Sequence, residues 1–112
     1  YVGKNPGQIF TSVHTRSSHG NTINTQITPV PNIEDGFYVF AIDWTEDYID
    51  FFLDENRVYR YAAQIQTLET WPFNKPFFLL INLAIGGNFG GPVGNTVTFP
   101  REYFIDYVRV YQ

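Results

Sequence analysis

The feature that most restricts how this chain can fold is a nearly continuous apolar run at residues 77–85. The run is far shorter than the ~20 residues that a membrane helix needs. It fits a central β-strand covered on both faces, because a strand with only one buried face would alternate apolar and polar residues. The chain around it must therefore supply sheet layers or belong to a domain that supplies them.

The rest of the sequence also has the pattern of an all-β protein. No segment keeps a helical periodicity, and short runs of β-forming residues are separated by Gly, Pro, Asn and Asp. Besides 77–85, strands are expected at residues 8–15, 37–44, 48–54, 58–61 and 102–111. Strands with apolar residues on both sides need partner strands to cover them. The sequence therefore predicts part of a larger sandwich of antiparallel sheets.

Alternation within two of these strands predicts which residues face inward. Ile49 and Leu53 are expected to face a core, with Asp50 on the polar face of the same strand. In residues 8–15, Val13 lies on one face and His14 on the other.

The segments between the strands are predicted as loops and turns. Asn56 tolerates a left-handed backbone, so a tight hairpin is expected at residues 54–57. Residues 16–33 are polar and predict a long loop, a kind of segment that is often functional. One helical turn is possible within 62–70. Loops are expected at 71–76 and 86–92, the second being rich in glycine.

Composition and charge exclude several classes of partner. The chain of 112 residues is one domain at most, and its 19% aromatic content suits sheets packed face to face. The net charge is −4 and no Lys/Arg cluster is present, so a nucleic acid is not expected as a partner. A membrane is not expected either, because the longest apolar runs are too short for a membrane helix. Cysteine is absent, which excludes disulfides and thiolate metal sites.

Two polar residues interrupt predicted apolar rows. Asn82 lies within the run 77–85, where a buried amide without partners would cost about 1–3 kcal/mol. It is therefore either a core residue bonded to the backbone or a donor to a sugar hydroxyl in a wet cleft. Asp106 shares a face with Phe104 and Val108 and needs an arginine, backbone donors or a metal. Oxygen-only coordination would favour calcium.

The histidine and tryptophan candidates keep two interpretations each. His14, near a strand end, is a surface histidine, a proton carrier or a sugar contact. Trp44 is expected to pack in a core because it lies on an alternating apolar face. Trp71, in a Pro-rich loop, either packs or contacts a ligand. The acidic residues around Glu46 predict a solvated hairpin rather than a catalytic cluster.

Several stretches together resemble glycoside hydrolase family 16. They are residues 43–54, residues 71–88 and the closing segment 105–112, in this order and spacing. Residues 14–22 are similar to a histidine-containing strand and loop in the laminarinase-like members, which are endo-β-1,3-glucanases. The resemblance implies a concanavalin-type β-sandwich, or jelly roll, of which residues 1–112 form the C-terminal half with no second domain.

The resemblance also implies where the catalytic residues lie. The family's catalytic strand has the motif Glu-x-Asp-x-x-Glu, which is found nowhere in this chain, and residues 1–3 are similar to those that follow the motif. All catalytic residues are therefore expected upstream of Tyr1, and none within the chain. With the N-terminal half as its partner, the protein would be a retaining hydrolase of laminarin-type β-glucan. The fragment alone would be inactive.

Binding residues carry over position by position. The resemblance implies that Asn82 and His14 contact the sugar, and that Asp106 binds a structural calcium. Arg16, Asn88 and Phe89 are further candidates for substrate binding because their loops are expected at the rim of the cleft; Trp71 is a candidate as well. Such an enzyme would be secreted to the extracellular space, or would lie in the periplasm or at the cell surface.

Two other functions remain open at this point. The absence of a carboxylate row also fits a non-catalytic carbohydrate-binding jelly roll. A lichenase, agarase or carrageenase of the same family is the third possibility. Lichenases carry a Trp two residues after the Asn, where this chain has Ala84, which argues against a lichenase.

Overall fold

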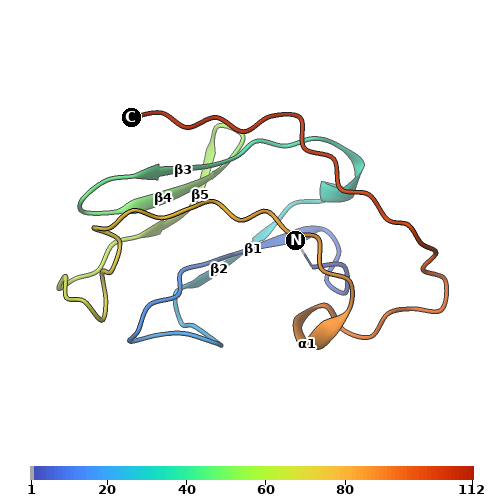
Figure 1. Ribbon diagram of the computed structural model, residues 1–112, viewed down its shortest axis with the longest axis horizontal. Coiled ribbons are helices and arrows are strands. Elements are labelled where there is room, and N and C mark those ends of the chain that lie inside the picture. Colours follow the sequence, from blue (N-terminus) through green and yellow to red (C-terminus); the bar gives the residue numbers. More distant parts are fainter. Residues whose placement is uncertain (1) are drawn as a thin grey trace. The chain divides into compact units, whose positions relative to one another are not determined.

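The computed structural model describes residues 2–112, which divide into two compact units. The first unit ends at Leu79 and the second spans Leu80–Gln112. Every strand of the described residues lies in the first unit, where all pairing is antiparallel (Figure 1). The all-β prediction is therefore confirmed. None of the helices among residues 2–112 has the length and apolar character needed to cross a membrane.

The first sheet is a pair of strands, β1 (Gln8–Ser12) and β2 (Thr25–Pro29). Phe10 lies opposite Ile27, and the hydroxyls of Ser12 and Thr25 share a hydrogen bond of 2.8 Å across the strands. The prediction of an unbroken loop at 16–33 is wrong, because β2 lies within it. Its polar sequence concealed a strand in which threonines supply the β-branched side chains.

The second sheet has the order β3 (Phe40–Trp44), β4 (Ile49–Leu53), β5 (Asn56–Tyr61). The tight hairpin predicted between β4 and β5 is present, but Asp54 and not Asn56 adopts the left-handed backbone, with φ 53°. The Asp54 carboxylate also accepts a hydrogen bond of 2.9 Å from the Val39 amide, so this one residue both turns the chain and holds the start of β3.

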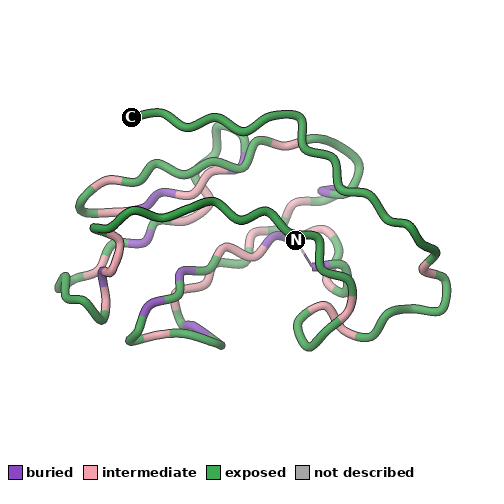
Figure 2. The backbone as a smooth tube through the Cα atoms, in the orientation of Figure 1, coloured by how far each residue is buried: buried purple, intermediate pink, exposed green. Residues whose placement is uncertain are grey.

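Two apolar clusters hold the sheets together. The first contains Val13, Ile49, Tyr61 and Trp71. The second contains Ile9, Ile33 from the 3₁₀ turn η1 (Ile33–Asp35), and Leu53. The second cluster draws on both sheets, the first joins the second sheet to the residue that follows β1, and β2 also contacts β5. The inward face predicted from alternation in β4 is therefore confirmed for Ile49 and Leu53, which are 7% and 8% exposed. Figure 2 shows that the buried residues are confined to short stretches of the chain.

Two predicted strands are not observed. Residues 77–85 and 102–111 belong to neither sheet, and almost all of their side chains are exposed. The physical reason is that a two-sided apolar strand needs a neighbour on each side, and the described residues pair neither segment with one.

The segments around the last glycines also differ from expectation. Residues 86–92 contain a single helical turn, α1 (Gly87–Gly90), which the loop prediction missed. Gly86 has φ 75°, and a Cβ there would lie 2.7 Å from Val93 Cγ2, so only glycine fits. Residues 62–70 contain no helix; a turn closes there when the Trp71 amide donates 2.7 Å to Thr67 O.

The expectation that the Asp50 carboxylate is solvated is wrong. Asp50 is only 4% exposed. Arg60 from β5 donates from Nε to Oδ1 at 2.6 Å and from Nη2 to Oδ2 at 2.5 Å, and Arg57 Nη1 lies 3.3 Å from Oδ2. Arg60 also stacks over the Tyr48 ring, 4.0 Å from its centroid. Hydrogen bonding from Arg60, and then from Arg57, lowers the pKa of Asp50 against the opposing effect of burial.

We predict that Asp50 makes stability depend on pH in a defined direction. Its pKa is lower in the folded chain than in the unfolded chain, so its contribution is present above the ordinary carboxyl value of about 3.9 and is lost as pH falls through the folded value. Asp50→Asn should lower the urea midpoint at neutral pH, and the gap from the unaltered chain should close at acid pH.

Asp43→Asn is the matched control, because Asp43 lies opposite Asp50 in the ladder but is exposed. Asp43 accepts only a long hydrogen bond of 3.4 Å, from the Tyr48 hydroxyl, so Asp43→Asn should lower the urea midpoint at neutral pH by much less than Asp50→Asn. A constant gap for Asp50→Asn across the acid range would contradict the role assigned to the carboxylate.

Candidate functional site

The segment that carries His14 and Arg16 is held by hydroxyl groups. Thr22 Oγ1 donates to Val13 O at 2.9 Å, accepts from the Asn24 amide at 3.1 Å and shares a hydrogen bond of 2.8 Å with Ser18 Oγ. Because the Thr22 proton is committed to Val13, the Ser18 hydroxyl must be the donor between the two. These bonds fix both ends of the segment after β1.

A second set of contacts ties this segment to the turn before Trp71. The Ser17 amide donates to Glu69 O at 3.0 Å, and Arg16 Nη1 lies 3.5 Å from Glu69 Oε1. Both charged side chains are largely exposed, so this ion pair contributes little to stability. It does give the Arg16 guanidinium a defined direction. His14 and His19, which flank Arg16 in the sequence, are exposed.

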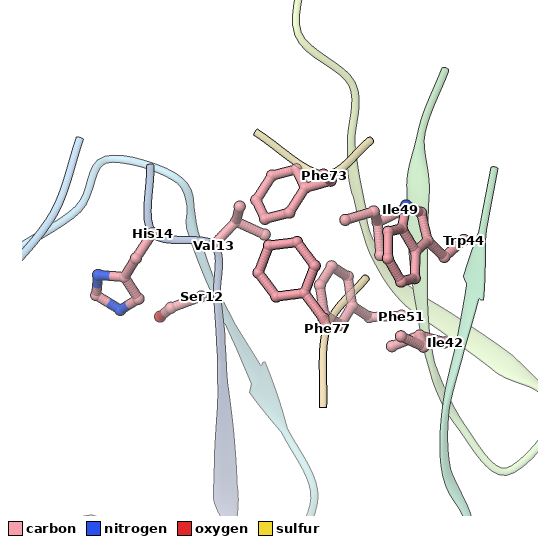
Figure 3. A pocket seen from close by; sticks show the side chains of 9 residues that line it. All are labelled: Ser12, Val13, His14, Ile42, Trp44, Ile49, Phe51, Phe73 and Phe77. Carbon is pink, nitrogen blue, oxygen red and sulfur yellow. The ribbon is translucent and has the colours of Figure 1, made fainter. Parts of the chain in front are cut away.

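An apolar cavity of about 220 Å³ opens between the two sheets of the first unit (Figure 3). Its lining comes from β1, β3, β4 and the segment after Trp71: Ser12, Val13, His14, Ile42, Trp44, Ile49, Phe51, Phe73 and Phe77. The imidazole of His14 points away from the aromatic side chains, while Val13 points toward them. Sequence reasoning missed this cavity, because its walls come from segments far apart in the chain.

Trp71 is corrected as a candidate for substrate contact. It is 4% exposed and lies in the first core cluster. Its ring stacks on Tyr61 at 5.7 Å between centroids and meets the edge of Phe73 at 5.3 Å. Of the two interpretations, packing is the one that the structure supports.

Trp44 is more exposed than predicted, whereas Trp71 is buried. It was expected to be a core residue, but it is 41% exposed and lines the apolar cavity. Its ring meets Phe77 edge-on at 5.8 Å, and Phe77 is 5.8 Å from Phe73. A continuous chain of aromatic contacts therefore runs from the buried Trp71 to the exposed Trp44.

The other substrate-binding candidates lie in the second unit. Asn82 is exposed within the segment after Leu79, and Asn88 and Phe89 belong to α1. α1 begins directly after Gly86, whose positive φ of 75° ends the extended segment before it. Placement of these side chains in a cleft stays a prediction.

Asp106 was predicted to bind calcium, which takes six to eight oxygen ligands. It is exposed, and among residues 2–112 no three His, Cys, Asp or Glu side chains come together in a group that could hold a metal. Asp106 can supply one carboxylate, and the other oxygen ligands would have to be backbone carbonyls or groups from outside the described residues, so calcium binding there stays a prediction.

The carboxylates of Asp43 and Asp50 are a pair whose suitability for glycoside cleavage can be judged from their surroundings. Asp43 and Asp50 face each other in the ladder, but Asp50 is held by two arginines and its pKa is lowered. A general acid needs a raised pKa, so Asp50 is a structural residue. The expectation that the catalytic carboxylates lie upstream of Tyr1 stays a prediction.

The sequence matches the model of glycosyl hydrolases family 16 over residues 1–109. It is 36% identical to a β-glucanase of Rhodothermus marinus, over 100% of this chain and 42% of that protein. It is 31% identical to glucan endo-1,3-beta-glucosidase A1 of Niallia circulans, over 98% of this chain and 18% of that protein.

Among solved structures, the laminarinase from Flavobacterium sp. UMI-01 matches with a TM-score of 0.79 and 55% identity, covering 81% of this chain and 40% of the laminarinase. The chain thus spans less than half the length of these relatives. The predicted jelly-roll class of fold is confirmed by this structural match.

We predict that the Thr22 hydroxyl, and not threonine in general, holds the segment after β1. Thr22→Val leaves the Val13 carbonyl and the Asn24 amide without their partner, which costs about 1–3 kcal/mol. Thr28→Val is the matched control, because Thr28 Oγ1 is buried without a hydrogen-bond partner among the described residues. Urea unfolding should show a lower stability for Thr22→Val and an unchanged or higher stability for Thr28→Val. Equal losses in the two variants would contradict this.

Proposed function

Since this chain belongs to glycosyl hydrolase family 16, we propose that it is the C-terminal part of an endo-acting β-1,3-glucanase that hydrolyses laminarin-type β-glucan. The observation that carries the proposal is its 55% identity and TM-score of 0.79 with the Flavobacterium laminarinase. The Niallia relative, described as an endo-1,3-β-glucosidase, supports the same linkage. The relatives named here are hydrolases, which favours an enzyme over a purely carbohydrate-binding jelly roll.

In this proposal the chain supplies part of the cleft and the rest of the domain supplies the chemistry. One glutamate outside the chain attacks the anomeric carbon and forms a glycosyl-enzyme. A second glutamate protonates the leaving oxygen and then activates the water that releases the sugar. Retention of configuration requires these carboxyl groups to lie about 5–5.5 Å apart.

The proposed contribution of this chain is to bind and orient the glucan. Asn82 and Asn88 would donate and accept hydrogen bonds with sugar hydroxyls, and Phe89 would stack on a sugar ring. His14 and Arg16 would contact the glucan from the segment after β1. Support for the last two comes from their exposure and from the hydroxyl bonds and the Glu69 contact that fix their segment.

Two further parts of the proposal concern the whole protein. A structural calcium at Asp106 requires most of its oxygen ligands from outside this chain, so no catalytic step depends on it. A polymeric glucan substrate also favours a protein that acts outside the cytoplasm, either secreted or at the cell surface.

We predict that the longer gene product containing this chain cleaves laminarin internally and retains the anomeric configuration. Proton NMR of the first product should show the β-anomer before mutarotation, while the 112-residue chain alone should release no sugar. A first product of inverted configuration, or a longer product without activity on laminarin, would contradict the proposal.

The same assay tests the binding role of this chain. Asn82→Ala should lower kcat/KM by about tenfold, the effect of losing one hydrogen bond of roughly 1.4 kcal/mol. Asn74→Ala is the control, because Asn74 is also exposed and the proposal gives it no contact with the glucan. Equal kcat/KM for both variants would remove Asn82 from the cleft.

A further inference from the structure

Glu69, which no sequence motif singled out, is an exposed carboxylate carried by a turn that is held in place. Its amide donates to Thr67 Oγ1 at 3.2 Å, and the hydroxyl of Thr70 donates to Ile65 O at 2.6 Å. Two residues after Glu69, Trp71 is 4% exposed and belongs to the first core cluster. The backbone of Glu69 is therefore fixed to the core, although its side chain lies in solvent.

Arg16 lies at the tip of a second tight turn. The Thr15 amide donates to Ser18 O at 2.8 Å, and the Ser18 amide donates back to Thr15 O at 3.2 Å. Thr15, at the base of this turn, is 5% exposed. The bond of 3.0 Å from the Ser17 amide to Glu69 O joins the two turns through the backbone alone. The two charged side chains are thus brought together by contacts that need neither charge.

The ion pair between Arg16 and Glu69 does little to hold the fold. The two side chains are 69% and 58% exposed, and Nη1 lies 3.5 Å from Oε1. An exposed pair of this kind scarcely offsets the rotamer entropy that is lost when two long side chains are ordered. Its physical effect is on the guanidinium, which has several N–H donors. Among residues 2–112 its partner is Glu69, which engages Nη1, so the donors of Nε and Nη2 stay available for a ligand.

A neutral glucan makes this orientation matter for binding. Its hydroxyl groups accept hydrogen bonds from a guanidinium but bring no anion that could orient it, so an orienting carboxylate must come from the protein. We propose that Glu69 is a positioning residue, which holds the Arg16 guanidinium in the direction from which Nε and Nη2 donate to hydroxyls of the β-glucan. The inference rests on the proposed function, which gives Arg16 its contact with the glucan.

Kinetics of the longer gene product on laminarin test the proposal. Glu69→Gln keeps the length of the side chain and the backbone carbonyl that accepts from Ser17, but removes the charge. KM should rise about threefold, within the range of an exposed ion pair, while kcat and the urea midpoint stay unchanged. Glu55→Gln is the matched control, because Glu55 is also an exposed glutamate, in the turn between β4 and β5, and its replacement should leave KM unchanged.

Two further measurements separate positioning from other roles. In the Arg16→Ala background, Glu69→Gln should have no further effect on KM, because Glu69 acts only through the guanidinium. Laminarin is uncharged, so added salt should act on KM by screening the ion pair. Salt should therefore bring the KM of the unaltered protein toward that of Glu69→Gln and leave the KM of the variant unchanged.

Three results would overturn the proposal. An unchanged KM for Glu69→Gln would mean that the carboxylate does not act on binding. An equal effect of Glu69→Gln with and without Arg16 would make Glu69 a direct contact of the sugar. A lowered urea midpoint for Glu69→Gln, together with a loss of kcat, would make its role structural.

A measurement on the ligand-free protein separates this inference from the proposed function. The NMR order parameter of the Arg16 Nε–H bond in the longer product should fall in Glu69→Gln and stay unchanged in Glu55→Gln. An unchanged order parameter in Glu69→Gln would contradict the positioning role, whatever the enzyme cleaves. A lowered order parameter in a protein that does not cleave laminarin would retain the orientation of Arg16 by Glu69 and contradict the glucanase.

Discussion

Burial of the apolar faces of two sheets is the constraint on which the rest of this structure depends. Val13, directly after β1, meets Ile49 from β4 and Tyr61 from β5 around Trp71, and this contact joins a two-stranded hairpin to a three-stranded sheet. The same apolar layer continues beyond the core, through aromatic rings, to an open surface at Trp44. A domain of this size has little stability to spare, so an uncovered apolar layer of this kind indicates a need for further strands.

The local sequence pattern predicted which residues of a single strand face inward. Alternation placed Ile49 and Leu53 inward, and both are buried. What depends on a second strand could not be read in this way. Asp50 lies on the face that alternation predicts to be polar, yet two arginines on β5 bind its carboxylate. The sequence pattern of β4 alone cannot indicate these arginines. β2 was missed for the same reason, because its polar sequence becomes a strand only beside β1.

The candidate site also has parts that the sequence predicted and parts that only the structure shows. The resemblance of short motifs predicted the family, and burial then separated a core residue, Trp71, from exposed residues such as His14 and Arg16. The structure adds hydroxyl bonds from Thr22 that no motif indicated. Residues 77–85 set the limit of prediction from sequence: their composition predicts a covered strand, but cover is a property of neighbours, and the described residues provide none.

Amide hydrogen exchange can show whether this chain is one part of a larger sandwich. We expect the amides of β4 to exchange slowly both in the 112-residue chain and in the longer gene product, because β4 is paired on both sides. Amides of residues 80–85 should exchange rapidly in the 112-residue chain and slowly in the longer product, where strands would flank them. Slow exchange of residues 80–85 in the 112-residue chain by itself would contradict the account.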